Sequence, residues 1–262
     1  MSVQNFIPQI WEASLLNKFH ERSIASVITT APTEIRGNKI IFNNVSDVNV
    51  KDYEGSVTFD GLTTSKVELD MDIKKYFAFK VDDVDAVQAA GELIEPHTTE
   101  AAYSMQEEMD KAVLAEGLKT KNTVAKGEED KAYDLIVKVN LALNKNKVPK
   151  AERYIVINSE VLAELHLDPR FTLNYTVLEN GVLEGSKVNG STIVLSEELN
   201  GGNFAILGLH KSAIGFGTQL QETEAIRLEG SFADGVRGLE VAGAKLLRED
   251  AAVKCVPVAR KR

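Results

Sequence analysis

The side chains best suited to bind a metal ion or to act as a nucleophile are four histidines and one cysteine. The histidines are His20, His97, His166 and His210, and none has the i, i+4 partner of a helical metal site. Cys255 stands among valines and far from every histidine, which is typical of a cysteine buried in a strand. We therefore expect histidines at the surface or at helix ends, no metal site and no intrachain disulfide.

Acidic residues gather between positions 70 and 85, where oxygen ligands for a hard cation would be sought. Asp70 and Asp72 alternate with apolar residues, so they belong to the wet face of a strand. Asp82, Asp83 and Asp85 lack the glycine and the distal glutamate of a calcium-binding loop. Solvated charges are therefore the favoured interpretation of this group.

Gly215-Phe216-Gly217-Thr218 is a partial version of a phosphate-binding glycine motif. The third glycine is missing and no helix is expected to follow, so the segment fails the context of a dinucleotide site. The sequence also contains no P-loop, no GxSxG motif and no Cys/His nucleophile pattern. We therefore expect neither a cofactor nor enzymatic activity.

The charge balance argues against nucleic-acid recognition. The 262 residues carry a formal net charge of -9, whereas a basic face supplies most of the affinity of DNA-binding proteins. The basic tail of Lys254, Arg260, Lys261 and Arg262 is interpreted as a solvated terminus rather than a DNA contact. No apolar run reaches the length of a membrane span, and the N-terminus lacks the pattern of a signal peptide, so we expect no membrane partner.

Two apolar segments would be difficult to hide in a soluble monomer. One is Phe6-Ile7-Pro8-Gln9-Ile10-Trp11, which carries the only tryptophan, and the other is the alternating face of Val67, Leu69, Met71 and Ile73. A buried tryptophan removes about 150–250 Å² from water, worth about 4–6 kcal/mol before ordering costs. Chain ends fray unless they are bound, and a two-stranded ribbon cannot shield an apolar face. We therefore expect both segments to contact protein, on the chain's own body or on a neighbour.

Hydrophobic periodicity predicts an α+β protein, with strands first, then helices, then mostly strands. Gly37-Asn38 marks a two-residue hairpin, and the alternation from Lys66 to Lys74 marks a strand. A helix from His97 to Gly117 would bury a stripe of Ala102, Met105, Met109, Ala112 and Val113. The other expected elements are a helix at 129–144 with Leu135, Ile136, Val139 and Leu143 inward, a strand at 154–157, a short helix from Ser159 to Asp168, a loop at 174–189, and strands at 192–195, 204–207, 213–216, 225–228 and 236–247.

Three segments resemble, in order, parts of the major capsid proteins of tailed double-stranded-DNA bacteriophages. Residues 6–11 look like the N-arm of these proteins. The segment Tyr76-Phe77-Ala78-Phe79-Lys80-Val81-Asp82-Asp83-Val84-Asp85 resembles the part that follows their extended loop, and Phe232-Ala233-Asp234-Gly235-Val236-Arg237-Gly238-Leu239-Glu240-Val241-Ala242-Gly243-Ala244-Lys245 resembles their C-terminal part. The order of the elements agrees as well, so the resemblance covers essentially the whole chain.

The resemblance implies the tailed-phage major capsid fold in four parts. These are an N-arm at 1–28, an extended β loop at 29–80, a peripheral domain at 81–119 and 222–262 with a long spine helix, and an axial domain at 120–221. In that fold the arm and the loop reach across neighbouring subunits. The intersubunit contacts expected here are Phe6, Ile7, Ile10 and Trp11 in the arm, Lys51, Asp52 and Glu54 near the loop tip, and Val67, Leu69, Met71 and Ile73 in the loop strand.

The function implied by the resemblance is self-assembly, through pentamers and hexamers, into the icosahedral shell of a virion. The shell would enclose double-stranded DNA without sequence-specific binding, and it would form in the host cytoplasm. Because the chain starts almost directly with the arm, a separate scaffolding protein or a processed chain is implied, and a portal and decoration proteins are the other expected partners. Two alternatives remain open, namely a protein-cargo nanocompartment shell of the same fold and a motif-poor soluble α+β enzyme.

Overall fold

The computed structural model describes residues 23–45, 64–82, 94–127, 129–171, 176–178, 180–227 and 233–257. The helices in these segments are α2 (Ile24–Ile28), α4 (Ile94–Gly117), α5 (Ala132–Lys145) and α6 (Ser159–His166), with short 3-10 helices η1 (Leu199–Gly202), η2 (Lys211–Ala213) and η3 (Glu249–Ala251). The strands are β1 (Glu34–Arg36), β2 (Lys39–Val45), β3 (Thr64–Asp70), β4 (Ile73–Asp82), β5 (Arg153–Ile157), β6 (Thr176–Val177), β7 (Val182–Val188), β8 (Ser191–Leu195), β9 (Ile206–His210), β10 (Ile214–Arg227), β11 (Ala233–Leu246) and β12 (Ala252–Cys255).

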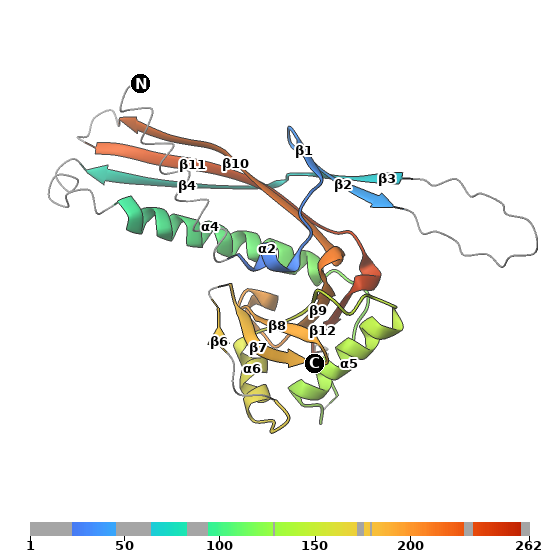
Figure 1. Cartoon of the computed structure of the whole chain (residues 1–262). Coiled ribbons are helices and arrows are strands. Elements are labelled where there is room, and N and C mark those ends of the chain that lie inside the picture. Colours follow the sequence, from blue (N-terminus) through green and yellow to red (C-terminus); the bar gives the residue numbers. More distant parts are fainter. Residues whose placement is uncertain are drawn as a thin grey trace, which may run out of the picture.

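A long antiparallel sheet in the order β10–β11–β4 forms the upper part of the molecule in Figure 1. Helix α4 runs along one face of this sheet and contacts all three of its strands (Figure 1). The predicted inward stripe of α4 is confirmed, because Ala102, Met105, Met109 and Val113 are buried and Ala112 is half-buried. The opposite face of the long sheet carries no helix in the described chain.

A six-stranded sheet, ordered β12–β9–β5–β8–β7–β6, forms the second body. Its β5 and β8 strands are parallel, and its other described pairings are antiparallel. Helix α5 packs on β9 and β12, and the predicted inward residues Leu135, Ile136, Val139 and Leu143 are fully buried. A single apolar core runs from this sheet to α2 and α4, so the two bodies share one interior.

The third sheet is a ribbon of β1, β2 and β3 that extends away from the body (Figure 1). A two-residue turn at Gly37-Asn38 joins β1 to β2 with Arg36 opposite Lys39, which confirms the predicted hairpin. Gly37 has a φ of 59°, a conformation that glycine adopts without steric cost. Exposed ion pairs flank the ribbon, such as Lys39 with Glu68 at 2.8 Å.

Helix α2 ties the start of the described chain to α4. The carboxylate of Asp110 on α4 accepts hydrogen bonds from the backbone nitrogens of Ile24, at 3.2 Å, and of Ala25, at 2.8 Å. These are donors that the first turn of a helix leaves without an internal partner. Burial raises the pKa of Asp110, against the opposing effect of its hydrogen bonds. Ile24, Ala25 and Ile28 are buried, so the last residues of the segment expected as an N-arm pack within the body.

The strand predicted from Lys66 to Lys74 is interrupted. At Met71 and Asp72 the chain leaves β3 and enters β4, and the backbone nitrogen of Met71 donates to the carbonyl of Asn38 at 3.0 Å. The alternation of buried and exposed side chains nevertheless continues through the break. The period-2 pattern therefore does not reveal the change of sheet, because β3 and β4 bury side chains of the same alternating set in their two sheets.

Two further expectations are wrong. The segment 174–189, expected as a loop, contains β6 and β7, joined by a turn in which the nitrogen of Gly181 donates to the carbonyl of Leu178. Its Asn180-Gly181 pair is a hairpin signal that sequence reasoning took for an irregular loop. The strands expected at 213–216 and 225–228 form one continuous β10. The polar run between them stays in the strand because β11 pairs along it, with a bulge between Leu220 and Glu222.

Asp110→Ala is expected to destabilise the protein by about 2–4 kcal/mol, because it leaves two buried backbone donors of α2 without an acceptor. Asp110→Asn keeps one acceptor oxygen and should lose less. The measurement is the free energy of unfolding from urea denaturation of each variant. Equal losses for the two substitutions would contradict a role for the carboxylate as the acceptor of α2.

Candidate interaction surfaces

The chemistry-bearing residues are dispersed in the structure. Among the described residues, no group of three or more His, Cys, Asp or Glu side chains could hold a metal ion. The Nδ1 of His210 lies 2.8 Å from the Oγ of Ser212, and burial lowers the pKa of this imidazole. Cys255 is fully buried in β12, as predicted, and burial raises the pKa of its thiol. Asp70 and Asp72 are exposed, as expected for the wet face of a strand.

The other histidines give no cluster within the described segments. His166 is the exposed last residue of α6, which confirms the expected helix-end position, and His97 lies near the start of α4. His20, Asp83 and Asp85 lie outside the described residues. Within the described segments, no helix is both long and apolar enough to span a bilayer.

The partial glycine motif has a packing role. A Cβ atom at Gly215 would lie 2.6 Å from Cζ of Phe42, and one at Gly217 would lie 2.8 Å from Cδ1 of Ile40. Gly243, the β11 partner of Gly217, would bring a Cβ to 3.0 Å from the carbonyl oxygen of Asp70. The absence of side chains at these positions lets the ribbon cross the long sheet in direct contact with its backbone.

The apolar face of the ribbon is partly covered by the chain itself. Met71 is fully buried in a small cluster with Ile40, Phe42 and Val241, against which Val67 and Leu69 pack half-buried. The ribbon does not shield Met71 by itself, as expected, because β11 lies beneath the root of the ribbon and covers this side chain from the chain's own body. Met71 has no surface left to offer to a neighbour, whereas Val67, Leu69 and Ile73 each keep some.

The remaining predicted contact residues cannot be placed. Phe6, Ile7, Ile10, Trp11, Lys51, Asp52 and Glu54 lie outside the described residues. Their assignment to intersubunit contacts stays a prediction.

The face of the long sheet opposite α4 carries an exposed apolar pair that sequence reasoning did not single out. Tyr76 on β4 and Leu239 on β11 are cross-strand partners, and they are 78% and 38% exposed. The alternation along β4 sends Phe77 and Phe79, which are half-buried, to the other face. The sequence shows this alternation, but it does not show which face of the sheet α4 covers.

A buried carboxylate also lies within the long sheet. Glu240 on β11 accepts a hydrogen bond from the hydroxyl of Thr218 on β10 through one oxygen, and its other oxygen has no hydrogen-bond partner in the structure. Burial raises the pKa of Glu240, and the hydrogen bond from Thr218 opposes the shift. The ionised form is therefore costly in this position.

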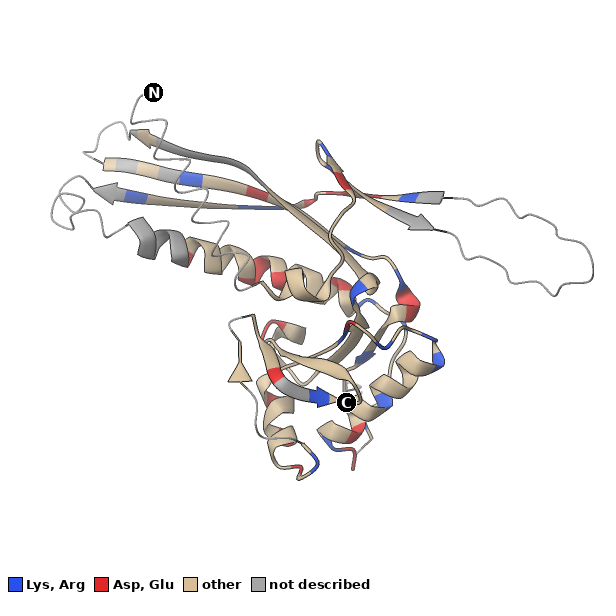
Figure 2. Cartoon of the chain, in the orientation of Figure 1, with Lys and Arg blue, Asp and Glu red and all other residues tan. Residues whose placement is uncertain are grey.

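Acidic residues recur along the described part of α4 (Figure 2). Lys111 is the one Lys or Arg in the sequence of this helix. Glu107 is exposed there and lines, with Glu197 and Glu198, a pocket of about 220 Å³ between α4 and the six-stranded body. Helix α4 therefore presents the exposed carboxylates of Glu100 and Glu107 to solvent.

Comparison with known proteins supplies the family. A family model described as phage capsid protein matches residues 66–255. The chain belongs to the phage capsid protein family. No curated protein matches the chain. The capsid protein is similar to a solved structure from Mycobacterium phage Che8, with a TM-score of 0.63 and 26% identity over 84% of this chain and 85% of that one.

Other solved structures share the fold of this capsid protein. The bacteriophage PhiM1 mature capsid matches with a TM-score of 0.63 and 14% identity, over 92% of this chain and 88% of that chain. A virus-like particle from Pyrococcus furiosus matches with a TM-score of 0.62 and 14% identity, over 97% and 100%. The expected tailed-phage capsid fold is confirmed, and the protein is a structural protein of a phage shell.

Gly217→Val is expected to destabilise the capsid protein by about 1–3 kcal/mol, because the new side chain would overlap Ile40 and lift the ribbon from the long sheet. Gln219→Val, which places the same side chain at an exposed position of the same strand, is the matched control. Urea denaturation of the unassembled subunit measures both. Similar losses in the two variants would mean that the crossing does not depend on Gly217.

Glu240→Gln is expected to stabilise the subunit relative to the wild type increasingly as the pH rises. The pKa of Glu240 is raised above its ordinary value of 4.5, so its contribution to stability is complete below that pH and is lost as the pH rises through the folded-state pKa. Unfolding free energies of both proteins between pH 4 and pH 8, with the exposed Glu100→Gln as control, test this. A pH-independent difference would overturn it.

Proposed function

We propose that this capsid protein assembles into an icosahedral shell that encloses the double-stranded DNA genome of a tailed phage. The observation that carries the proposal is a subunit of capsid fold with a ribbon that extends beyond its own body and an open apolar sheet face. Both features leave apolar surface for a neighbour to cover. One subunit then touches several others, and many weak contacts close the shell.

The parts of the subunit have distinct roles in this proposal. Residues 1–28 and 29–80 act as the N-arm and extended loop, 81–119 and 222–262 as the peripheral domain, and 120–221 as the axial domain. The sheet pairing favours two adjustments, namely that the loop ends at Asp70 and that the long sheet takes β10 from Ile214 onward. The axial domain then corresponds to the six-stranded body with α5 and α6, to which the C-terminal part of the chain adds β12.

The ribbon and the open sheet face are complementary candidates for one contact between neighbours. Val67 and Leu69 keep exposed surface on the ribbon, and Tyr76 and Leu239 offer an apolar platform on the long sheet. The tip residues Lys51, Asp52 and Glu54 would extend this contact, and Phe6, Ile7, Ile10 and Trp11 would add an arm contact. In the six-stranded body, Leu141 and Leu167 are exposed and are candidates for contacts around a capsomer axis.

The acidic side of α4 suits a wall that faces packaged DNA. Glu100 and Glu107 repel phosphates, so the genome would not adhere to the wall during packaging. We assign this side to the lumen of the shell. A reconstruction of assembled particles that places α4 on the outer surface would contradict the assignment.

The nearest rival is a shell of the same fold that holds protein cargo. The similarity to the Pyrococcus furiosus virus-like particle concerns the fold alone, whereas the family match is to phage capsid proteins, which favours a genome-containing shell. A scaffolding protein, a portal and decoration proteins are the partners that such a shell needs, and assembly in the host cytoplasm belongs to the same proposal. The protein itself has a structural and not an enzymatic role.

Size-exclusion chromatography followed by negative-stain microscopy tests the proposal directly. Purified protein should elute as large particles with icosahedral outlines, and particles from infected cells should contain nuclease-resistant DNA. Particles filled with protein and free of DNA would support the rival shell. A monomer with no tendency to assemble would overturn both readings.

Tyr76→Asp is expected to lower the yield of shells by at least about tenfold, because it places an unpaired charge in a contact that buries the ring. The stability of the free subunit should change by less than about 0.5 kcal/mol, since the side chain is 78% exposed there. Tyr76→Phe keeps the ring and should assemble normally. Particle counts by microscopy and urea denaturation give the two measurements, and normal assembly of Tyr76→Asp would remove this residue from the interface.

A further inference from the structure

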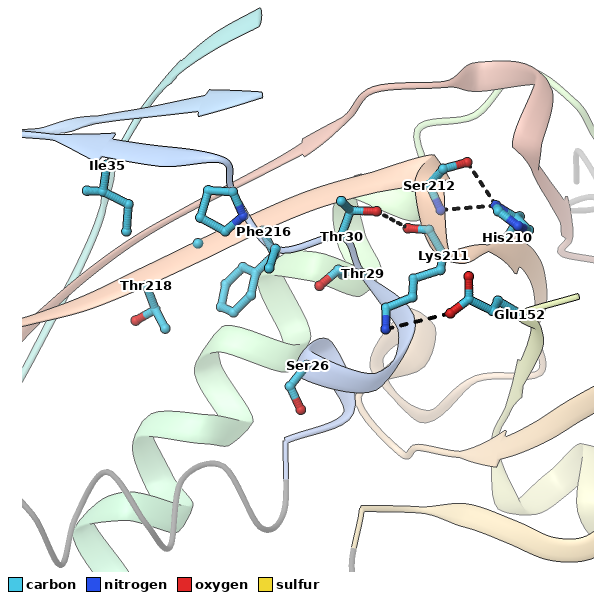
Figure 3. Close-up of a pocket in the computed structure, with 13 residues that line it drawn as sticks. Ser26, Thr29, Thr30, Ile35, Glu152, His210, Lys211, Ser212, Phe216 and Thr218 are labelled. Atoms are coloured by element: carbon cyan, nitrogen blue, oxygen red, sulfur yellow. Dashed lines mark hydrogen bonds and ion pairs between the residues drawn. The ribbon is translucent and has the colours of Figure 1, made fainter. Parts of the chain in front are cut away.

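A pocket of about 680 Å³ opens at the junction of α2, the segment before β1, and the start of β10 (Figure 3). Its volume lies within the range of pockets that bind small ligands or anchor side chains. Ile35 and Phe216 line one end, and Lys211, Glu152 and His210 line the other. Pro32 also lines the pocket. Ile35 is 39% exposed, so apolar surface is open to solvent at the rim.

The hydroxyl groups in this pocket are already engaged by the chain itself. Ser26 Oγ donates to the carbonyl of Ser23 at 2.8 Å, Thr29 Oγ1 to that of Ala25 at 2.6 Å, Thr30 Oγ1 to that of Lys211 at 2.9 Å and Thr218 Oγ1 to Glu240, while Ser212 Oγ pairs with His210 Nδ1 at 2.8 Å. The two formal charges pair with each other, Lys211 with Glu152 at 4.0 Å. With its polar groups satisfied, the pocket offers a ligand chiefly methyl and ring surface, which suits an apolar occupant.

The sequence supplies such an occupant close by. The chain enters the described structure at Ser23, immediately before α2, and Ser26 in the first turn of α2 lines the pocket. The apolar segment Phe6–Trp11 precedes this entry point, and the eleven residues between Trp11 and Ser23 let the chain span up to about 40 Å when extended. A tether of this length gives the segment a high effective concentration at the pocket.

We propose that the segment Phe6–Trp11 of the same chain occupies this pocket in the unassembled subunit, with Trp11 as its anchor. The segment covers the rim at Ile35 and packs on Phe216. Its docking removes apolar surface of both the segment and the pocket from water. The docked segment also lies against the residues from which the ribbon starts, so the arm and the ribbon are held at one place. This inference does not depend on the shell, because it concerns the free subunit.

Fluorescence of Trp11 tests the proposal without a label, because it is the only tryptophan. In unassembled full-length protein its emission should be blue-shifted relative to free tryptophan and weakly quenched by acrylamide. Ile35→Asp should shift the emission to the red and raise the quenching constant, because it places a charge at the apolar rim. Ile226→Asp is the matched control, since Ile226 is 37% exposed on β10 outside the pocket, and it should leave both values unchanged.

The possible outcomes separate the alternatives. The proposal would be overturned if acrylamide quenched Trp11 in the native wild type as strongly as in urea. It would also be overturned if Ile35→Asp and Ile226→Asp changed the emission and the quenching equally. Protection that disappears on serial dilution would assign the occupant to a second copy of the chain and also overturn it. Thermal unfolding of each variant verifies the fold, and Ile35→Leu should restore protection. Shell formation is scored separately by microscopy, and its outcome does not depend on whether Trp11 is protected in the free subunit.

Discussion

The crossing of the β2–β3 ribbon over the β10–β11 pair is the contact on which the rest of the subunit depends. Glycines at positions 215, 217 and 243 leave room for it, because a Cβ atom would meet the side chains of Phe42 and Ile40 at the first two positions and the carbonyl oxygen of Asp70 at the third. The small cluster around Met71 closes the contact, and β4 then continues from the ribbon as the third strand of the long sheet. One close approach therefore sets where the ribbon leaves the body and in which direction it points.

A subunit built around such a crossing has a packed apolar core at its centre and uncovered apolar side chains at its margins. The apolar core is continuous from α2 and α4 through the six-stranded sheet, so the body buries this surface within a single chain. The described part of the ribbon packs on the body at its root, and the open face of the long sheet keeps Tyr76 and Leu239 exposed to solvent. This division suits assembly, because the body keeps its shape while surfaces at the margins supply many weak contacts that become strong together.

Two buried carboxylates mark places where the interior is not purely apolar. Asp110 satisfies backbone donors of α2 and so connects the N-terminal part of the chain to α4. Glu240 is different, since one of its oxygens is buried and has no hydrogen-bond partner among the described residues. The first carboxylate stabilises a junction through hydrogen bonds, whereas the second makes the stability of the long sheet depend on its state of protonation. Chemically similar side chains thus have opposite effects because their surroundings differ in available donors.

The sequence by itself determined the local elements and the family resemblance. The 3.6-residue stripe of α4, the buried face of α5, the Gly37-Asn38 hairpin and the alternation of Val67, Leu69, Met71 and Ile73 all follow from short-range periodicity, which a single sequence displays. Only the tertiary structure decided that this alternation changes sheets at Met71, that Gly215 and Gly217 serve a crossing, and that α4 leaves Tyr76 uncovered. The physical reason is that these outcomes depend on contacts between residues far apart in sequence, such as Gly217 with Ile40 or Glu240 with Thr218, and a local pattern fixes which face is apolar but not which distant element will cover it.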